Sequence, residues 1–177
     1  MARVLKLNHT KKITNVLGAS EKYETFAVEA AFLVFCSTSA EPDIRDLANF
    51  TPVARYANRN PISVHEIGSC EEFRFVTSPE LTEYADGGVV TASAPTLLSN
   101  STRVDVYPFM IMGQDACYDV ALQGLNSFKM NHIPHTQVDS SDPGGQRGYV
   151  YTGFWCAPLL VNAGWMGVVE AGVTKQT

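Results

Sequence analysis

The chain has 177 residues, 45% of them hydrophobic, so it is long enough for one domain with its own core and is not globally disordered. Its net charge of −5 argues against a module that grips nucleic acid through a basic patch. No apolar run has the length of a membrane span, and the N-terminus lacks the apolar stretch of a signal peptide, so no membrane partner is expected.

The first third of the chain is predicted to combine two helices with one buried strand. Apolar positions recur at helical spacing over residues 2–17, and this helix has no N-cap, as expected of a helix whose beginning is missing. A polar connector at residues 21–24 leads to the apolar run 26–37, which predicts a buried strand. Residues 39–50 are predicted to form the second helix, with Ser39 as its N-cap and acidic residues in its first turn.

The middle of the chain is predicted to be less regular. A helical turn is expected at residues 53–58, and residues 62–67 and 73–76 are expected to be short strands with a turn at Gly68-Ser69. Residues 77–102 are rich in Gly, Ser and Thr and predict an exposed loop, with a short strand at Val89-Val90.

The last third is predicted to be a series of strands separated by turns. The strands are expected at residues 104–112, 117–122, 128–132, 149–158 and 165–173. Pro108 cannot donate to a strand ladder, so an edge position or a bulge is expected there. Residues 149–158 are apolar at both alternating sets of positions, Tyr149, Tyr151 and Trp155 on one face and Val150, Phe154 and Cys156 on the other. Such a strand is either buried on both sides or covered by a partner.

Three groups of residues contain side chains of the kind that catalytic, metal or phosphate sites use. His132 and His135 have a spacing that metal ligands use, but Pro134 lies between them and no carboxylate or cysteine cluster is adjacent, so a surface loop is the better interpretation. The loop at residues 144–148 resembles a phosphate loop, yet a strand rather than a helix follows it.

The four cysteines are far apart in sequence and are expected to be reduced and structural. Cys117 lies between Asp115 and Asp119, but acidic neighbours disfavour the thiolate that a nucleophile requires. A hydrolase that uses Cys117 or His132 is therefore the weakest hypothesis. We expect no enzymatic activity, no cofactor and no metal.

Three patches of the sequence resemble the major capsid proteins of tailed bacteriophages that have the Hong Kong 97-type capsid fold. The patches are Leu5 to Thr14, Tyr56 to Val76 with Pro61-Ile62 and His65-Glu66-Ile67-Gly68, and a third set formed by Tyr107-Pro108, Gly113-Gln114-Asp115-Ala116, Gln123-Gly124, Asp142-Pro143-Gly144, Gln146-Arg147, Asn162 and Trp165-Met166. They occur in the family's order and with similar spacing, and they correspond to its C-terminal two thirds. The turn before Trp165 is shorter than in the family, and the N-terminal arm, the E-loop and the front of the spine helix have no counterpart in this chain.

The resemblance implies an α+β fold, truncated at the N-terminus, that comprises the axial domain and part of the peripheral domain. Residues 1–20 would be the end of the spine helix and a connector, residues 21–145 the axial domain, and residues 146–177 the C-terminal strands of the peripheral domain. The function implied is that of a capsid subunit, or one half of a split subunit, in the shell that encloses phage DNA. The protein would be found in the virion, and in the host cytoplasm during assembly.

The implied partners are other copies of the chain and a second chain that supplies the arm and the E-loop, without specific binding of nucleic acid. The candidate subunit-interface residues are Arg147, Tyr149, Tyr151, Trp155 and Trp165. The alternative function is a β-rich module without catalysis that binds a small molecule or a carbohydrate through these aromatic residues.

Overall fold

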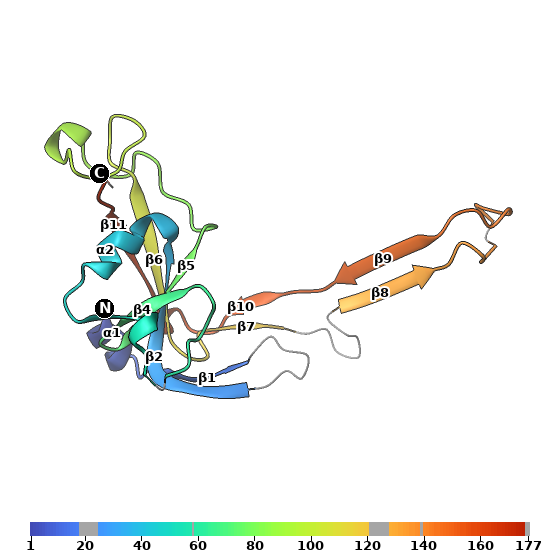
Figure 1. The fold of residues 1–177 in the computed structure, drawn as a ribbon, viewed down its shortest axis with the longest axis horizontal. Helices are drawn as coiled ribbons and strands as arrows, with labels where there is room; N and C mark the ends of the chain where they lie inside the picture. The colour runs from blue at the N-terminus through green and yellow to red at the C-terminus, as the bar shows by residue number, and fades with distance from the viewer. Residues whose placement is uncertain (18–24, 58, 121–127, 139, 176–177) are drawn as a thin grey trace. The chain divides into compact units, whose positions relative to one another are not determined.

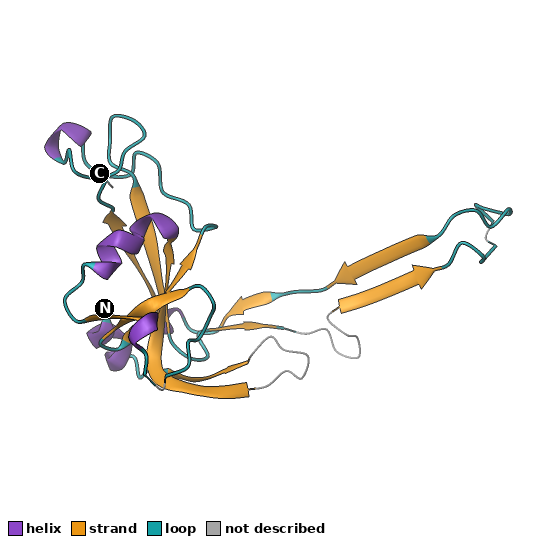
Figure 2. Cartoon of the chain, viewed as in Figure 1, coloured by secondary structure: helices purple, strands orange, loops and turns teal. Residues whose placement is uncertain are grey.

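The structure is a computed structural model that describes residues 1–17, 25–57, 59–120, 128–138 and 140–175. It divides into two compact units, one formed by residues 1–116 and 162–177 and the other by residues 117–161. Strands outweigh helices throughout the described residues, which is compatible with an α+β fold (Figure 2).

A mixed sheet of seven strands forms the centre of the first unit (Figure 1). Its strands are β1 (Ile13–Leu17), β2 (Thr25–Ser37), β3 (Phe50–Pro52), β4 (Glu66–Cys70), β5 (Phe73–Ser78), β6 (Val106–Met112) and β11 (Met166–Gly172). The spatial order is β11-β6-β2-β5-β4-β3, and β1 pairs with the first part of β2. The pair β2–β5 is parallel and the other pairs are antiparallel.

The helices of this unit are all short. They are α1 (Ala2–Leu7), α2 (Glu41–Arg45) and the 3-10 turns η1 (Thr38–Ala40), η2 (Val53–Arg55), η3 (Thr91–Ser93) and η4 (Ala163–Trp165). Ser37 caps η1 by accepting a hydrogen bond from the amide of Ser39, and Pro42 and two acidic residues occupy the first turn of α2.

One face of the sheet carries the hydrophobic core. Phe32, Val34 and Cys36 alternate along β2 and are buried, because successive side chains of a strand point to opposite faces. Leu5 of α1 and Ile44 of α2 pack against this face and are 0% and 3% exposed. Burial of a side chain of this size contributes about 1.5–3 kcal/mol, so α1 and α2 are held mainly by these two residues.

The opposite face of the sheet carries a buried arginine. Arg74 of β5 is 1% exposed, its guanidinium lies 5.4 Å from the ring centroid of Tyr56, and its Nη1 donates to the carbonyl of Asn60 at 3.0 Å. The carboxylate of Glu66 lies 3.8 Å from Nη1 and accepts a hydrogen bond from the Tyr56 hydroxyl. Burial, together with Glu66, raises the pKa of Tyr56 to about 12. This network connects the loop after η2 to the sheet.

A corner near the C-terminus joins α1 to β11. The indole N–H of Trp165 donates to the carbonyl of Asn8 at 3.0 Å, and the side-chain amide of Asn8 donates to the carbonyl of Gly164 at 2.8 Å. Gly113 passes so close to Thr10 that a Cβ at residue 113 would lie 2.1 Å from Thr10 Cγ2. Only glycine fits at this crossing of chain segments.

The second unit, which we call the ribbon, consists of residues 117–161. In it β7 (Cys117–Asp119) pairs with β10 (Pro158–Leu160), and β8 (Phe128–Ile133) pairs with β9 (Tyr149–Phe154), both antiparallel. At the turn between β8 and β9 the carboxylate of Asp142 accepts the amides of Gln146 and Arg147, and Gly145 has a φ of 59°.

Most predicted strands are confirmed. The strands expected at residues 26–37, 73–76, 104–112, 128–132 and 165–173 correspond to β2, β5, β6, β8 and β11. Of the strand expected at residues 117–122, residues 117–119 form β7, and residues 121–122 lie outside the described residues. Of the helical turn expected at residues 53–58, residues 53–55 form η2. The strand expected at residues 62–67 begins only at Glu66, as β4, and the strand expected at residues 149–158 ends at Phe154, as β9. At Pro108, strand β6 pairs with β11 but not with β2, because the pairing of β6 with β2 is confined to residues 110–112 of β6. The missing amide of Pro108 is therefore not needed for a second set of strand hydrogen bonds.

Other predictions were wrong. The helix expected over residues 2–17 ends at Leu7, and residues 13–17 form strand β1, because pairing with β2 outweighs a weak helical pattern. Gly68-Ser69 lies inside β4, and the chain instead turns after Cys70, where Glu71 has a φ of 53°. The helix expected over residues 39–50 is α-helical only from Glu41 to Arg45, and its N-cap is Ala40 rather than the expected Ser39. The connector at residues 21–24 lies outside the described residues.

The loop at residues 77–102 is exposed, as predicted, and hydrogen bonds to Asp105 hold it in place. The carboxylate of Asp105 is buried and accepts the amides of Asp86 at 3.1 Å and Asn100 at 3.0 Å. Val90 forms an isolated bridge with Arg103 in place of a strand at Val89-Val90. The predicted domain boundaries at residues 20 and 145 stay predictions.

Candidate assembly surfaces

Two exposed apolar surfaces stand out among the described residues, one on each unit.

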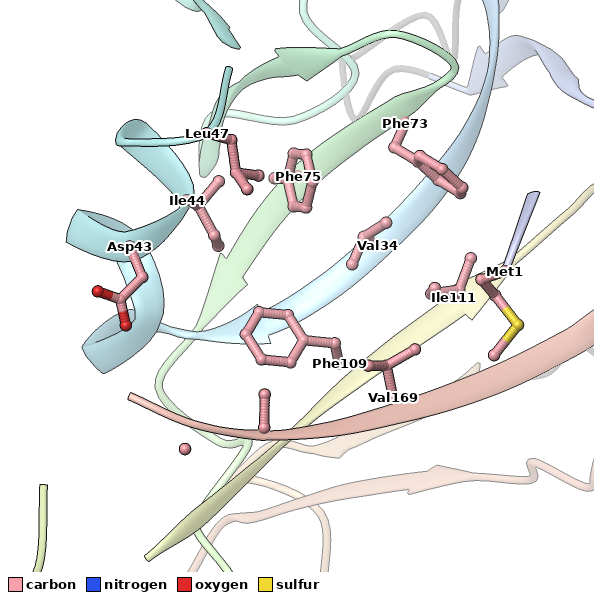
Figure 3. A pocket seen from close by; sticks show the side chains of 12 residues that line it. Met1, Val34, Asp43, Ile44, Leu47, Phe73, Phe75, Phe109, Ile111 and Val169 are labelled. Carbon is pink, nitrogen blue, oxygen red and sulfur yellow. The ribbon is translucent and has the colours of Figure 1, made fainter. Parts of the chain in front are cut away.

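The first surface is a groove on the core face of the sheet. Sheet residues Val34, Phe73, Phe75, Phe109, Ile111, Val169, Ala171 and Gly172 form its floor, and Met1, Asp43, Ile44 and Leu47 form its sides. Figure 3 shows α2 beside Phe75 at one end of the groove and Met1 beside Ile111 and Val169 at the other. The groove has a volume of about 340 Å³. It therefore exists because α1 and α2 leave part of the core face uncovered.

The groove has a single charged lining residue, Asp43, and its carboxylate is already bonded. Asp43 accepts hydrogen bonds from the amide and the hydroxyl of Thr174, which fixes α2 to the C-terminal segment. The other lining side chains are apolar. The groove therefore suits an apolar occupant and offers little to a carbohydrate, whose hydroxyls need polar partners.

The second surface is one face of the strand pair β8–β9. Directly paired residues of antiparallel strands point to the same face, so the register decides which side chains lie together. One face, which we call the Phe128 face, carries the pairs Phe128–Phe154, Met130–Thr152 and His132–Val150. Its four apolar residues Phe128, Met130, Val150 and Phe154 are 57%, 67%, 69% and 74% exposed. This is a continuous apolar surface without cover from the described residues.

The opposite face of β8–β9 is more polar. It carries the pairs Lys129–Gly153, Asn131–Tyr151 and Ile133–Tyr149. The Tyr151 ring folds over Gly153, where its hydroxyl would lie 2.6 Å from a Cβ. Tyr151 thus covers part of its own strand, which leaves the Phe128 face as the more open apolar surface.

The predicted interface residues fall into two groups. Arg147, Tyr149, Tyr151 and Trp155 all lie in the ribbon and are exposed, Tyr149 and Tyr151 on its more polar face. Trp165 lies in the first unit, is half-buried, and donates its indole N–H to Asn8. A role of these five residues at a subunit interface stays a prediction.

The sequence interpretation missed part of the apolar surface. Val150 and Phe154 were assigned to a common face, but Phe128 and Met130 were not assigned to it, because pairing register is not visible in a single strand. The apolar side chains of Phe128 and Met130 alternate with polar ones in β8, and this was the available signal.

The described residues contain no group of three or more His, Cys, Asp or Glu side chains placed to hold a metal ion. Cys117 is exposed in β7, and the carboxylate of Asp119 accepts the amide of Ala157. Burial, with Glu41 nearby, raises the pKa of the Cys36 thiol to about 12, so Cys36 is an inert core residue. No helix in the described part of the chain has the length and apolarity needed to cross a membrane.

Comparison with known proteins gives one distant relative. No protein-family profile matches the chain. The chain is similar to the major capsid protein of Pseudomonas phage KPP21, with 19% identity over 175 residues. The similarity covers 92% of this chain and 44% of the relative, so the chain spans less than half the length of the protein it matches.

Proposed function

We propose that the protein is a structural subunit of a tailed-phage capsid, with a Hong Kong 97-type fold and no enzymatic activity. The observation that carries this proposal is the similarity to a phage major capsid protein across 92% of the chain. The groove and the Phe128 face support it, because a shell subunit needs apolar surfaces that become covered on assembly. The net charge of −5 suits a shell that encloses DNA without specific binding.

The proposal includes the partners and the location of the protein. Other copies of the chain surround it in capsomers, in the virion and, during assembly, in the host cytoplasm. A second chain supplies the N-terminal arm and the E-loop.

Electron microscopy of the purified protein, alone and together with co-purifying chains, tests the proposal. Shells or ring-shaped capsomers are expected. Phe154→Ser combined with Met130→Ser should abolish them, because both residues belong to the exposed Phe128 face. Val64→Ser is the matched control, since Val64 is 96% exposed in the first unit and belongs to neither apolar surface. A protein that is strictly monomeric under all conditions contradicts the proposal.

The alternative, a module that binds a small molecule or a carbohydrate, has one observation in its favour. The groove contains three phenylalanines, Phe73, Phe75 and Phe109, although none of the tyrosines and tryptophans that suggested the alternative lines it. An apolar ligand that raises the melting temperature of the monomer would support this function.

A further inference from the structure

We propose that the Phe128 face of one copy docks into the groove of a second copy. This inference rests on the proposed function for one premise, that copies of the chain contact one another in a shell. It adds which two surfaces meet and the symmetry of the contact.

The Phe128 face requires a partner of a definite kind. An isolated two-stranded ribbon is marginally stable in water, and this one exposes four large apolar residues on one face. At the exposed fractions of Phe128, Met130, Val150 and Phe154, these side chains present on the order of 500 Å² of mainly apolar surface, given about 200 Å² for an aromatic side chain. This is below the roughly 800 Å² per partner of a stable complex of two proteins. The area therefore fits a contact that is weak alone and is repeated in a larger assembly.

The groove offers the complementary surface. Its floor consists of apolar side chains from four neighbouring strands, with Phe75 and Phe109 near α2 and Val169 on the outermost strand (Figure 3). The single carboxylate in its lining is already bonded to Thr174, so an apolar occupant leaves no lining charge without a partner. An apolar face of a strand pair matches such a floor better than a polar ligand does.

The sheet edge beside the groove favours an extended occupant. In the described part of the chain, β11 pairs with β6 on one side and has no strand on the other. Both β8 and β9 likewise pair only with each other. An exposed edge of this kind accepts an added strand through backbone hydrogen bonds. The open edge of β11 therefore leaves room for a ribbon of a second copy that lies over the groove and extends past β11.

The contact joins two different surfaces, so it is heterologous, and repetition produces rings or open chains rather than a closed pair. Rings of this kind are what a capsomer requires.

Matched variants test the inference. Leu47→Lys and Val169→Lys place a charge in the groove at positions that are 44% and 39% exposed, so the fold should tolerate them. Val168→Lys is the control, because Val168 is the neighbour of Val169 on β11, is 50% exposed and points to the opposite face of the sheet. Each groove variant should weaken self-association at least about tenfold in sedimentation velocity, and the control should not. Circular dichroism of each variant confirms its fold.

Mixing gives a sharper test. Val169→Lys retains an intact Phe128 face, and Phe154→Ser retains an intact groove, so each should stay monomeric alone. Because the single contact is weak, the equimolar mixture should show one-to-one association at high protein concentration, where neither variant alone associates. The inference is overturned if the groove variants associate like the wild type. That result is expected if another polypeptide or a small molecule, and not a second copy, occupies the groove. A mixture that stays monomeric would also overturn it.

The mixing experiment needs no shell, so the two proposals can fail separately. If the groove variants still form shells, this inference is wrong and the proposed function stands. If the mixture forms one-to-one dimers but the wild-type protein never forms shells or rings, the proposed function is wrong and this inference stands.

Discussion

Arg74 shows how a single buried residue organises part of this protein. Its guanidinium is inaccessible, and its Nη2 has no hydrogen-bond partner among the described residues. The ion pair with Glu66 is long, at 3.8 Å, and the contact with Asn60 is a single hydrogen bond. A buried charge is expensive, so its value here lies in fixing the loop that follows η2 rather than in net stabilisation.

Replacement of Arg74 by Met should destabilise the protein by about 3 kcal/mol, because the buried Glu66 carboxylate loses its cation. Urea unfolding measures this. Arg59→Met is the control, since Arg59 is about half exposed in its pair with Glu29 and should cost less than about 1 kcal/mol. The double variant Arg74→Met/Glu66→Gln should recover part of the loss. Equal effects of Arg74→Met and Arg59→Met would argue against a buried network.

Glu72 gives the protein a stability that depends on pH. It accepts contacts from Lys6 at 2.6 Å and Lys12 at 3.0 Å, and these two lysines lower its pKa below the ordinary value. A carboxyl whose pKa is lower in the folded state stabilises the fold above its unfolded pKa and loses this contribution as pH falls through the folded pKa.

The urea concentration at the midpoint of unfolding should therefore decrease as the pH is lowered below about 4.5, the ordinary pKa of glutamate. Glu72→Gln should make this decrease shallower. The effect should shrink in high salt, because both lysines and Glu72 are partly exposed. If the urea midpoint decreases equally steeply at acid pH in the wild type and in Glu72→Gln, the two lysines do not act through Glu72.

At the scale of the element, the long loop before β6 is ordered by one carboxylate. Asp105 bonds the amide of Asp86 on one side of the loop and of Asn100 on the other, while the Asp86 carboxylate accepts the amide of Arg103. Asp86 has a φ of 56°, a left-handed conformation that aspartate tolerates better than most residues. The composition of the loop indicates mobility, whereas these contacts hold its two sides together.

Asp105→Ala should leave two backbone amides without acceptors, at a cost of about 1–3 kcal/mol for each one that stays buried. Hydrogen exchange at Asp86 and Asn100 should accelerate, and exchange in β2 should change only with global stability. Asp46→Ala is the control, because Asp46 is exposed and lies outside this loop. Unchanged protection of both amides in Asp105→Ala would refute this role of the carboxylate.

At the scale of the whole molecule, the ribbon is an insertion between two paired strands. Strands β6 and β11 are antiparallel neighbours, paired from Val106 opposite Gly172 to Met112 opposite Met166. The chain enters the ribbon after Ala116 and returns to the first unit at Asn162. The amide of Gly113 donates to the carbonyl of Trp165, so the two ends are close in space. An insertion with adjacent ends can be removed without breaking the sheet.

Replacement of residues 117–161 by a short Gly-Ser linker should leave a folded first unit whose free energy of unfolding changes by no more than about 1 kcal/mol. The shortened protein should form neither shells nor capsomers, which size-exclusion chromatography with light scattering would reveal. An unfolded product would show that the first unit depends on the ribbon. Assembly like that of the full chain would contradict a role of the ribbon in it.

The sequence alone determined most of the strands, because alternating and continuous apolar runs such as 26–37 and 104–112 reflect local backbone preference and burial. It also determined the resemblance that led to the proposed function. It did not determine that residues 13–17 form a strand, since this depends on pairing with a segment that begins at Thr25. The Phe128 face and the groove became visible only in the tertiary structure. The face depends on the pairing register of β8 and β9, and the groove depends on how α1 and α2 cover the sheet, and both bring together residues that are distant in sequence.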